Sequence, residues 1–212
     1  MANKQPEVTA RTRARLRHAF WELYAVKPIE KISVREITER AGYNRATFYL
    51  HYQSVYDLLH QIEDELLSHR RHLFEGLEHA DPTAIPSTHL PNREELERQI
   101  QAFVAVTKRD APYLAVLLGP HGDAEFLERI KNVDVRLIAM YAGVPATAAP
   151  TATTREYVRE FYVSGLLAVM RKWLADPNAM PIEQFVRFLI EAFFPALRDA
   201  RQGTHRPPAE SA

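Results

Sequence analysis

The segment from Ser33 to Tyr52 constrains the fold of this 212-residue chain more than any other, because it carries two helix starts separated by a turn. Ser33 stands three residues before Glu36, in the Ser-x-x-Glu capping box that begins many helices. Apolar residues then recur at helical spacing, and Gly42 follows where a left-handed residue can end a helix. Asn44 is a favoured N-cap residue, so the sequence predicts a second helix that runs from there to the end of the segment.

Two short helices joined by a glycine-containing turn make a helix-turn-helix, whose second helix can enter a DNA major groove. The second predicted helix carries several side chains that can donate hydrogen bonds to guanine or to phosphate oxygens: Arg45, Thr47, Tyr49 and His51. Phe48 and Tyr52 lie four residues apart and are expected to face inward. An ordinary helical hairpin in a bundle is the alternative interpretation of this segment.

The distribution of charge indicates a polyanionic partner for the N-terminal part. The chain has 27 basic and 27 acidic residues, but residues 1–60 contain ten basic and six acidic ones, a net charge of +4. A membrane surface is also polyanionic, so charge alone does not choose DNA. No apolar stretch approaches the ~18 residues of a membrane span, and the N-terminus has no signal-peptide core. Together with the absence of cysteine, this predicts a cytoplasmic protein without a membrane partner.

Helical periodicity without strand signals predicts an all-α fold of about nine helices. We expect a disordered arm over residues 1–8, a helix-turn-helix DNA-binding domain over 9–53 with the helix-turn-helix at about 33–52, a helical effector-binding and dimerisation domain over 54–200, and a disordered tail over 201–212. The first helix, from Thr9, has four arginines near its start, at positions 11, 13, 15 and 17. Cations there oppose the helix dipole, so DNA phosphates could supply the missing negative charge.

The later helices are placed by their caps and apolar spacing. Ser54, with Asp57 three residues on, opens a long helix that runs to about His79. A proline-rich loop over 81–91 and a small-residue linker over 143–151 separate the elements that follow. The remaining predicted helices span about 92–108, 110–118, 123–141, 153–173 and from Pro181 onward.

Residues 9–67 resemble the N-terminal DNA-binding domain of TetR-family transcriptional regulators, on the strength of RTRARLRHAFWELY and SVREITERAGYNRATFYLHYQSVYDLL. The segment FYVSGLLAVMRKWL, with the last apolar helix, is similar to a TetR subgroup that includes the activator of dihydroxyacetone utilisation. The resemblance implies a homodimer that binds a palindromic operator in double-stranded DNA, ordinarily as a repressor released by a small ligand. It also allows a coregulator-dependent activator.

The resemblance further implies roles for individual residues in DNA binding. Ser33 would hold a phosphate, Arg35 would reach a base, and Tyr49 would donate its hydroxyl to a phosphate. The residues that would line the groove are Arg45, Thr47, Leu50 and His51. One departure is Val55, which stands where many family members carry a lysine, so a phosphate contact is either missing or supplied by Lys31 or Arg45.

Two further sets of residues are candidates in the C-terminal part. Central aromatic residues predict either an apolar effector pocket or a plain helical core: Phe74, Phe103, Tyr113, Phe126, Phe161 and Tyr162. The last two helices combine small and large apolar residues and predict a four-helix dimer interface, or else they cover their own domain. The interface candidates are Tyr157, Phe161, Gly165, Ala168, Phe185, Leu189 and Phe193.

The sequence predicts no enzyme, no cofactor and no metal site. It contains no nucleophile elbow and no glycine-rich phosphate loop. His69 and His72 have a spacing that can bind a metal, but a solvated helix face is the favoured interpretation. The remaining alternative to a regulator is a helical protein-interaction module whose basic first helix meets an acidic partner or a membrane.

Overall fold

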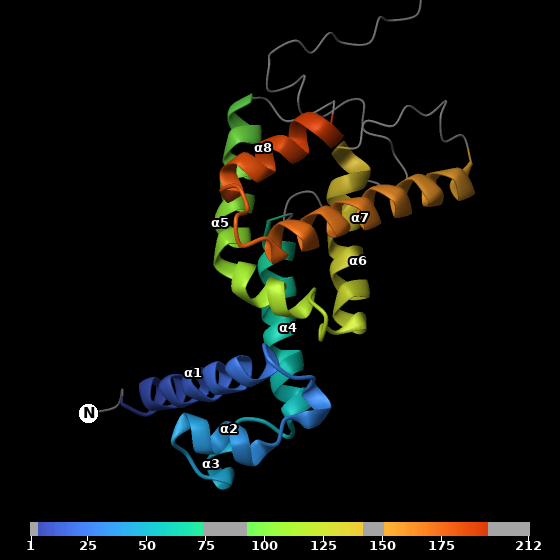
Figure 1. Ribbon diagram of the computed structural model, residues 1–212. Coiled ribbons are helices and arrows are strands. Elements are labelled where there is room, and N and C mark those ends of the chain that lie inside the picture. Colours follow the sequence, from blue (N-terminus) through green and yellow to red (C-terminus); the bar gives the residue numbers. More distant parts are fainter. Residues whose placement is uncertain (1–3, 74–92, 142–150, 195–212) are drawn as a thin grey trace, which may run out of the picture. The chain divides into compact units, whose positions relative to one another are not determined.

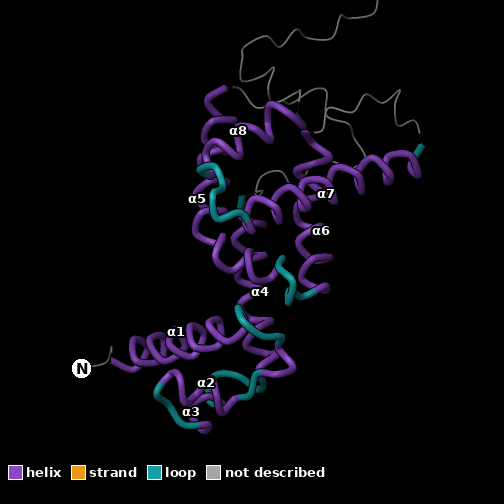
Figure 2. Tube along the Cα trace, in the orientation of Figure 1, coloured by secondary structure: helices purple, strands orange, loops and turns teal. Residues whose placement is uncertain are grey.

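The computed structural model describes residues 4–73, 93–141 and 151–194, and these residues form helices and loops without a strand (Figures 1 and 2). The all-α prediction is confirmed, with eight α-helices in the described ranges rather than about nine. None of these helices is long and apolar enough to cross a membrane. In chain order the elements are α1 (Lys4–Tyr24), η1 (Ile29–Lys31), α2 (Val34–Ala41), α3 (Arg45–Tyr49), α4 (Val55–His72), α5 (Arg93–Leu117), α6 (Ala124–Tyr141), α7 (Ala152–Ala175) and α8 (Ile182–Phe193).

The chain divides into two compact units, of which the first is Met1–Leu66 together with Val116–Phe126. Within it, α1 packs against α2 and α2 packs against α3. Its interior is made of large apolar side chains that are almost fully inaccessible, among them Leu16, Phe20, Tyr24, Ile37, Phe48, Leu58 and Ile62. The rings of Phe20 and Tyr24 stack at 5.4 Å between centroids. This core holds the short helices α2 and α3 in a fixed arrangement.

The first helix begins earlier than the sequence analysis predicted, so residues 4–8 are helical and not a disordered arm. Pro6 is tolerated because the first N–H groups of a helix have no intrahelical partner. Glu7 in the first turn also favours the helix dipole. Arg11 therefore lies about two turns inside the helix, and the expected conflict between the arginines and the dipole does not arise.

The second unit is Leu67–Ala115 together with Leu127–Ala212. Its α5 runs without a break through the positions at which we predicted two separate helices, with Pro112 inside it. Proline removes one hydrogen bond from a helix interior. Two residues further along, the side chain of Leu114 is fully inaccessible. The predicted loop at 81–91, most of the linker at 143–151 and the tail at 201–212 lie outside the described residues.

The two last helices meet at a corner that the sequence analysis did not foresee. Trp173, near the end of α7, stacks on Phe185 of α8 with 4.9 Å between ring centroids. The Trp173 indole N–H also donates to the Met180 carbonyl at 2.8 Å. A capping box of Thr151 and Thr154 starts α7. The apolar face of α8 is consequently turned into its own unit.

Candidate DNA-binding surface

The start of α2 is fixed by the predicted capping box between Ser33 and Glu36, which is confirmed. The Glu36 carboxylate accepts the Ser33 amide at 3.0 Å and its hydroxyl at 2.9 Å, while the Glu36 amide donates to Ser33 Oγ at 3.3 Å. Lys27 Nζ donates to the other Glu36 oxygen at 2.6 Å. The hydrogen bond from Lys27, followed by those from Ser33, lowers the pKa of Glu36 to about 2.

The turn between α2 and α3 depends on Gly42, which has φ 75° and ψ 34° in the left-handed region. Only glycine adopts this conformation without a steric cost. The Tyr43 amide donates to the Thr38 carbonyl at 2.9 Å and so closes the end of α2. A Cβ added at Gly42 would meet no atom within 4 Å. The requirement for glycine therefore comes from the backbone angle and not from crowding.

The recognition helix α3 is shorter than predicted. It spans five residues, Arg45–Tyr49, whereas the sequence analysis expected a helix to Tyr52. After Tyr49 the chain continues in a turn, in which the Tyr52 amide donates to the Phe48 carbonyl at 3.0 Å. Phe48 and Tyr52 are buried, as predicted, with ring centroids 5.4 Å apart. Anchoring both rings in the core ends the helix early and turns its opposite side outward.

The outward side of α3 carries most of the residues predicted to read DNA. Arg45, Tyr49 and Leu50 are exposed, Leu50 by 80%. Thr47 and His51 are half-buried, and the Thr47 hydroxyl donates to Asn44 Oδ1 at 3.0 Å. Thr47 is thus engaged in capping the helix, so its hydroxyl proton is not free for a base. Within the described part of the chain, no acidic side chain pairs with Arg45.

Of the other residues considered for DNA contacts, Ser33 and Arg35 are exposed and Val55 is buried. Ser33 is exposed at the start of α2. Arg35 Nε lies 2.6 Å from Glu39 Oε1, and both side chains are exposed. Exposed ion pairs of this kind contribute little, so Arg35 can leave its partner for DNA at small cost. Val55 is buried and packs into the core of its own unit, so it does not replace the lysine contact.

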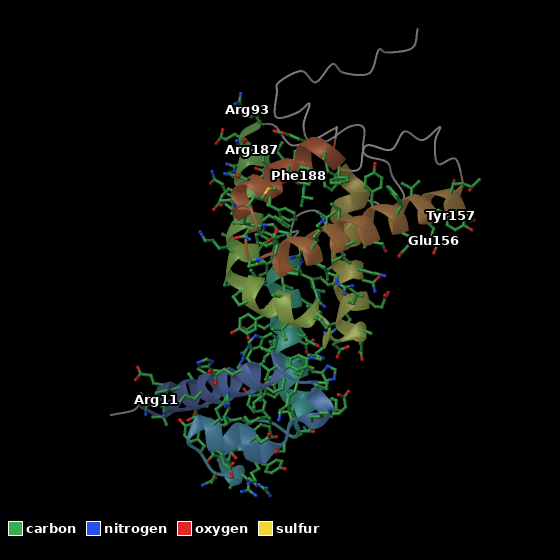
Figure 3. The ribbon with its side chains drawn as sticks, viewed as in Figure 1. Arg11, Arg93, Glu156, Tyr157, Arg187 and Phe188 are labelled. Carbon is green, nitrogen blue, oxygen red and sulfur yellow. The ribbon has the colours of Figure 1, made fainter. Side chains whose placement is uncertain are left out.

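Two arginines of α1 have side-chain partners on α4, and two have no acidic partner among the described residues. Arg13 donates to the Gln61 amide oxygen at 3.1 Å, and Arg17 pairs with Glu65 at 2.6 Å. Arg11 and Arg15 are exposed, and no acidic side chain in the described residues pairs with either. Figure 3 shows Arg11 on the part of α1 near the N-terminus. The unit that carries α3 therefore presents positive charge that is not neutralised internally.

The predicted dimer-interface residues on α7 are exposed, whereas those on α8 are buried or half-buried. On α7, Tyr157, Phe161, Gly165 and Ala168 share one exposed face, with Phe161 exposed by 75%. Figure 3 shows Tyr157 projecting from the N-terminal part of α7. The candidates on α8 are different: Phe185 and Leu189 are buried and Phe193 is half-buried. Because Phe185 and Leu189 are buried in their own unit, they are not available to a second chain in this structure, whereas Phe193 is partly accessible.

The described pocket candidates differ in their burial and in the unit to which they belong. Phe126 is fully buried in the first unit and Phe161 is exposed, while Phe74 lies outside the described residues. Tyr113 and Tyr162 are half-buried. The Arg70 guanidinium lies over the ring of Phe103, 5.5 Å from the ring centroid.

A separate groove of about 440 Å³ lies between α5 and α8, and the aromatic residues of the sequence did not predict it. Its lining is Glu97, Ile100, Gln101, Val104, Ala105, Lys108, Glu183, Arg187 and Ile190.

His69 and His72, whose spacing could suit two metal ligands, each lie near a different partner. His69 Nδ1 lies 3.3 Å from the Asp110 carboxylate, and His72 Nδ1 lies 2.8 Å from the Ser68 carbonyl oxygen. Among the described residues, no three metal-ligating side chains gather at one point.

Two protein-family models match this chain, one in its N-terminal part and one in its C-terminal part. The family model described as bacterial regulatory proteins, tetR family, matches residues 16–62. The model described as transcriptional regulator C-terminal region matches residues 94–194. No curated protein sequence gives a significant match.

Solved structures with the same fold include a TetR transcriptional regulator from Streptococcus agalactiae 2603V, with a TM-score of 0.56 at 19% identity over 97% of this chain and 100% of that one. The fatty acid degradation regulator FadR from Bacillus halodurans also has a TM-score of 0.56, at 15% identity over 88% of this chain and 96% of its own. The dihydroxyacetone kinase operon activator DhaS has a TM-score of 0.49 at 14% identity, over 85% and 92% of the two chains. Identities this low concern the fold alone.

Both matching family models describe transcriptional regulators, and the exposed helix α3 of a capped helix-turn-helix agrees with a DNA-binding one. The chain belongs to the TetR family, so the resemblance drawn from residues 9–67 is confirmed.

Proposed function

We propose that this protein is a homodimeric repressor that reads a palindromic operator with the exposed side of α3. The observation that carries the proposal is the outward presentation of Arg45, Tyr49 and Leu50, while Phe48 behind them is buried. Arg45 donates to guanine in the major groove, and Leu50 contacts a thymine methyl group. Tyr49 donates to a phosphate, which positions the helix without reading sequence.

The exposed face of α7 supports the dimer. Tyr157 and Phe161 are large aromatic side chains in water, and Gly165 and Ala168 on the same face allow a second helix to approach closely. Pairing of α7 with its copy buries this face about a two-fold axis. A two-fold dimer reads two half-sites that lie about one helical turn, or slightly more, apart.

Regulation is proposed to act on the distance between the two recognition helices. The groove between α5 and α8, of about 440 Å³, lies in the second unit and is large enough for a small molecule. Its lining combines the aliphatic side chains of Ile100, Val104 and Ile190 with charged side chains at its edges, including Lys108 and Arg187. A ligand releases the operator only if its affinity differs between the bound and free spacings of the dimer.

Selection of genomic fragments by the purified protein tests the function. The expected result is a pool of fragments that share one inverted repeat with half-sites about one turn apart, bound more weakly as salt rises. A pool without a shared repeat would count against operator reading. The sign of regulation follows from a reporter gene placed behind the selected repeat, because repression lowers expression and deletion of the regulator restores it. Expression that falls on deletion would identify an activator instead.

A further inference from the structure

Gln61 on α4 lies between two groups of opposite hydrogen-bonding character. Its amide oxygen accepts from Arg13 Nη2 of α1 at 3.1 Å, and its amide nitrogen donates to Asp57 Oδ1 at 3.3 Å, one turn earlier on α4. A guanidinium group can only donate, and a carboxylate can only accept. The side chain between them must therefore accept on one side and donate on the other, which an amide does and a carboxylate, an ammonium or a thioether does not.

The same Asp57 carboxylate holds the backbone that follows the recognition helix. Its other oxygen, Oδ2, accepts the Gln53 amide at 2.8 Å. Gln53 comes four residues after Tyr49, the last residue of α3. Three consecutive hydrogen bonds thus join α1 to the end of the segment that carries the recognition helix. We call this chain, from Arg13 through Gln61 and Asp57 to the Gln53 amide, the Gln61 relay.

A second contact between α1 and α4 runs beside the relay. Arg17 Nη1 lies 2.6 Å from Glu65 Oε2. Arg17 follows Arg13 by four residues, and Glu65 follows Gln61 by four, so the two links lie one turn apart on both helices. All these residues belong to the first unit. A shift of α4 along α1 would therefore lengthen both links together, and the relay would pass that shift to Gln53.

The segment between α3 and Gln53 carries a residue proposed to contact a base. Leu50 is 80% exposed, whereas Tyr52 beside it is buried in the core. The segment is consequently held at two points, by the Tyr52 ring and by the Gln53 amide, and Leu50 projects just before them. A binding side chain needs neighbouring hydrogen bonds that hold it within about 0.5 Å of its productive position.

We propose that Gln61 is a positioning residue for base reading, which ties α1 to the end of the recognition segment and makes no contact with DNA itself. The inference rests on the proposed operator binding and adds to it a residue that acts through Asp57 and Gln53. A single hydrogen bond of this kind changes an equilibrium constant by about two- to tenfold, which sets the size of the expected effects.

The first test measures the relay without DNA, by amide hydrogen exchange at Gln53. Arg13→Met and Gln61→Met each remove one hydrogen bond and keep an unbranched side chain. The matched control is Gln99→Met, because Gln99 also donates to an acid four residues earlier, Glu95 at 3.0 Å, but on α5. We expect exchange at Gln53 to accelerate by about two- to tenfold in both test variants and to stay unchanged in the control. Unchanged exchange in Gln61→Met would overturn the relay.

The second test is a double-mutant cycle on DNA binding. Dissociation constants for the selected operator and for a random duplex are measured for the wild type, both single variants and the double variant. Gln61→Met should weaken operator binding by about two- to tenfold and change random binding far less. Arg13→Met removes a charge and weakens both duplexes, but that loss is the same with or without Gln61 and cancels in the cycle. Gln61→Met should therefore add little once Arg13 is replaced, and an equal effect in both backgrounds would contradict the relay.

The outcomes separate this inference from the proposed function. A wild-type protein that binds no shared repeat would overturn the operator proposal, while exchange at Gln53 would still decide whether the relay exists. A wild type that binds its repeat, together with a Gln61→Met variant of unchanged operator-to-random ratio, would overturn only the positioning role. The expected variant loses that ratio at the wild-type thermal midpoint. A lowered midpoint with equal weakening of both duplexes would show general stabilisation and would also contradict the inference.

Discussion

Asn44 and Thr47 close the first turn of the recognition helix: the Asn44 carboxamide oxygen accepts the Thr47 amide at 2.8 Å and the Thr47 hydroxyl at 3.0 Å. The helix that depends on this cap has five residues, too few to be stable through its own hydrogen bonds. The cap and the two rings behind it therefore decide whether Arg45 and Tyr49 are held in a geometry that fits a groove.

Replacing Asn44 by Ala should remove the cap and destabilise α3 by about 1 kcal/mol. Amide hydrogen exchange of residues 45–50 should accelerate, while exchange in the core of α1 should stay unchanged. Asn44→Ser retains a side-chain oxygen that can accept the same amide and serves as the control. Equal exchange in the Ala and Ser variants would show that the cap does not hold the helix.

Gly42 should tolerate asparagine better than alanine. Its φ of 75° is costly for most residues, at about 1–2 kcal/mol, but Asn adopts the left-handed region with less penalty. Since nothing lies within 4 Å of an added Cβ, packing does not mask this difference. Thermal unfolding should therefore give the order wild type, Gly42→Asn, Gly42→Ala. An alanine variant as stable as wild type would mean that the turn relaxes to another conformation.

The capping box should respond to acid in a defined window. The pKa of Glu36 is lowered to about 2 from an ordinary value of 4.5, first by Lys27 and then by Ser33. A lowered carboxyl pKa stabilises the folded state above the unfolded pKa, and this contribution is lost as the pH falls from about 4.5 towards 2. An NMR titration of the Glu36 side chain should show the lowered pKa, and Lys27→Met should raise it. A Glu36 that titrates at its ordinary pKa in both proteins would contradict the hydrogen bonds that Lys27 and Ser33 donate to it.

The dimer should depend on the exposed face of α7. Phe161→Glu places a charge in the middle of that face, so sedimentation at micromolar concentration should show a monomer where the wild type shows a dimer. Val26→Glu is the matched control, because Val26 is also highly exposed, by 72%, but lies in the first unit. Loss of the dimer in both variants, or in neither, would exclude α7 as the specific interface.

The sequence predicted those parts of the structure that local signals determine. The capping box at Ser33, the turn at Gly42 and the inward rings of Phe48 and Tyr52 each follow from spacing within a few residues, and each is found as expected. The cap of α4 at Ser54 is another case, with the Asp57 amide donating to Ser54 Oγ at 3.1 Å.

What the sequence could not supply are the properties that tertiary packing sets. Periodicity showed that Phe185 and Leu189 lie on one apolar face of α8, but not that the stack with Trp173 turns that face inward. We predicted two helices over about 92–108 and 110–118, but the chain forms one helix that contains Pro112.

The central claim is that α3 reads bases, and the Arg45→Ala variant tests it most directly. Its affinity for the selected operator and for a random duplex is compared with that of the wild type at one salt concentration. A lost guanine contact costs about 1–3 kcal/mol, so the ratio of operator to random affinity should fall by roughly tenfold or more, while random binding changes far less. Equal weakening of both duplexes would place Arg45 on the backbone and would contradict the account.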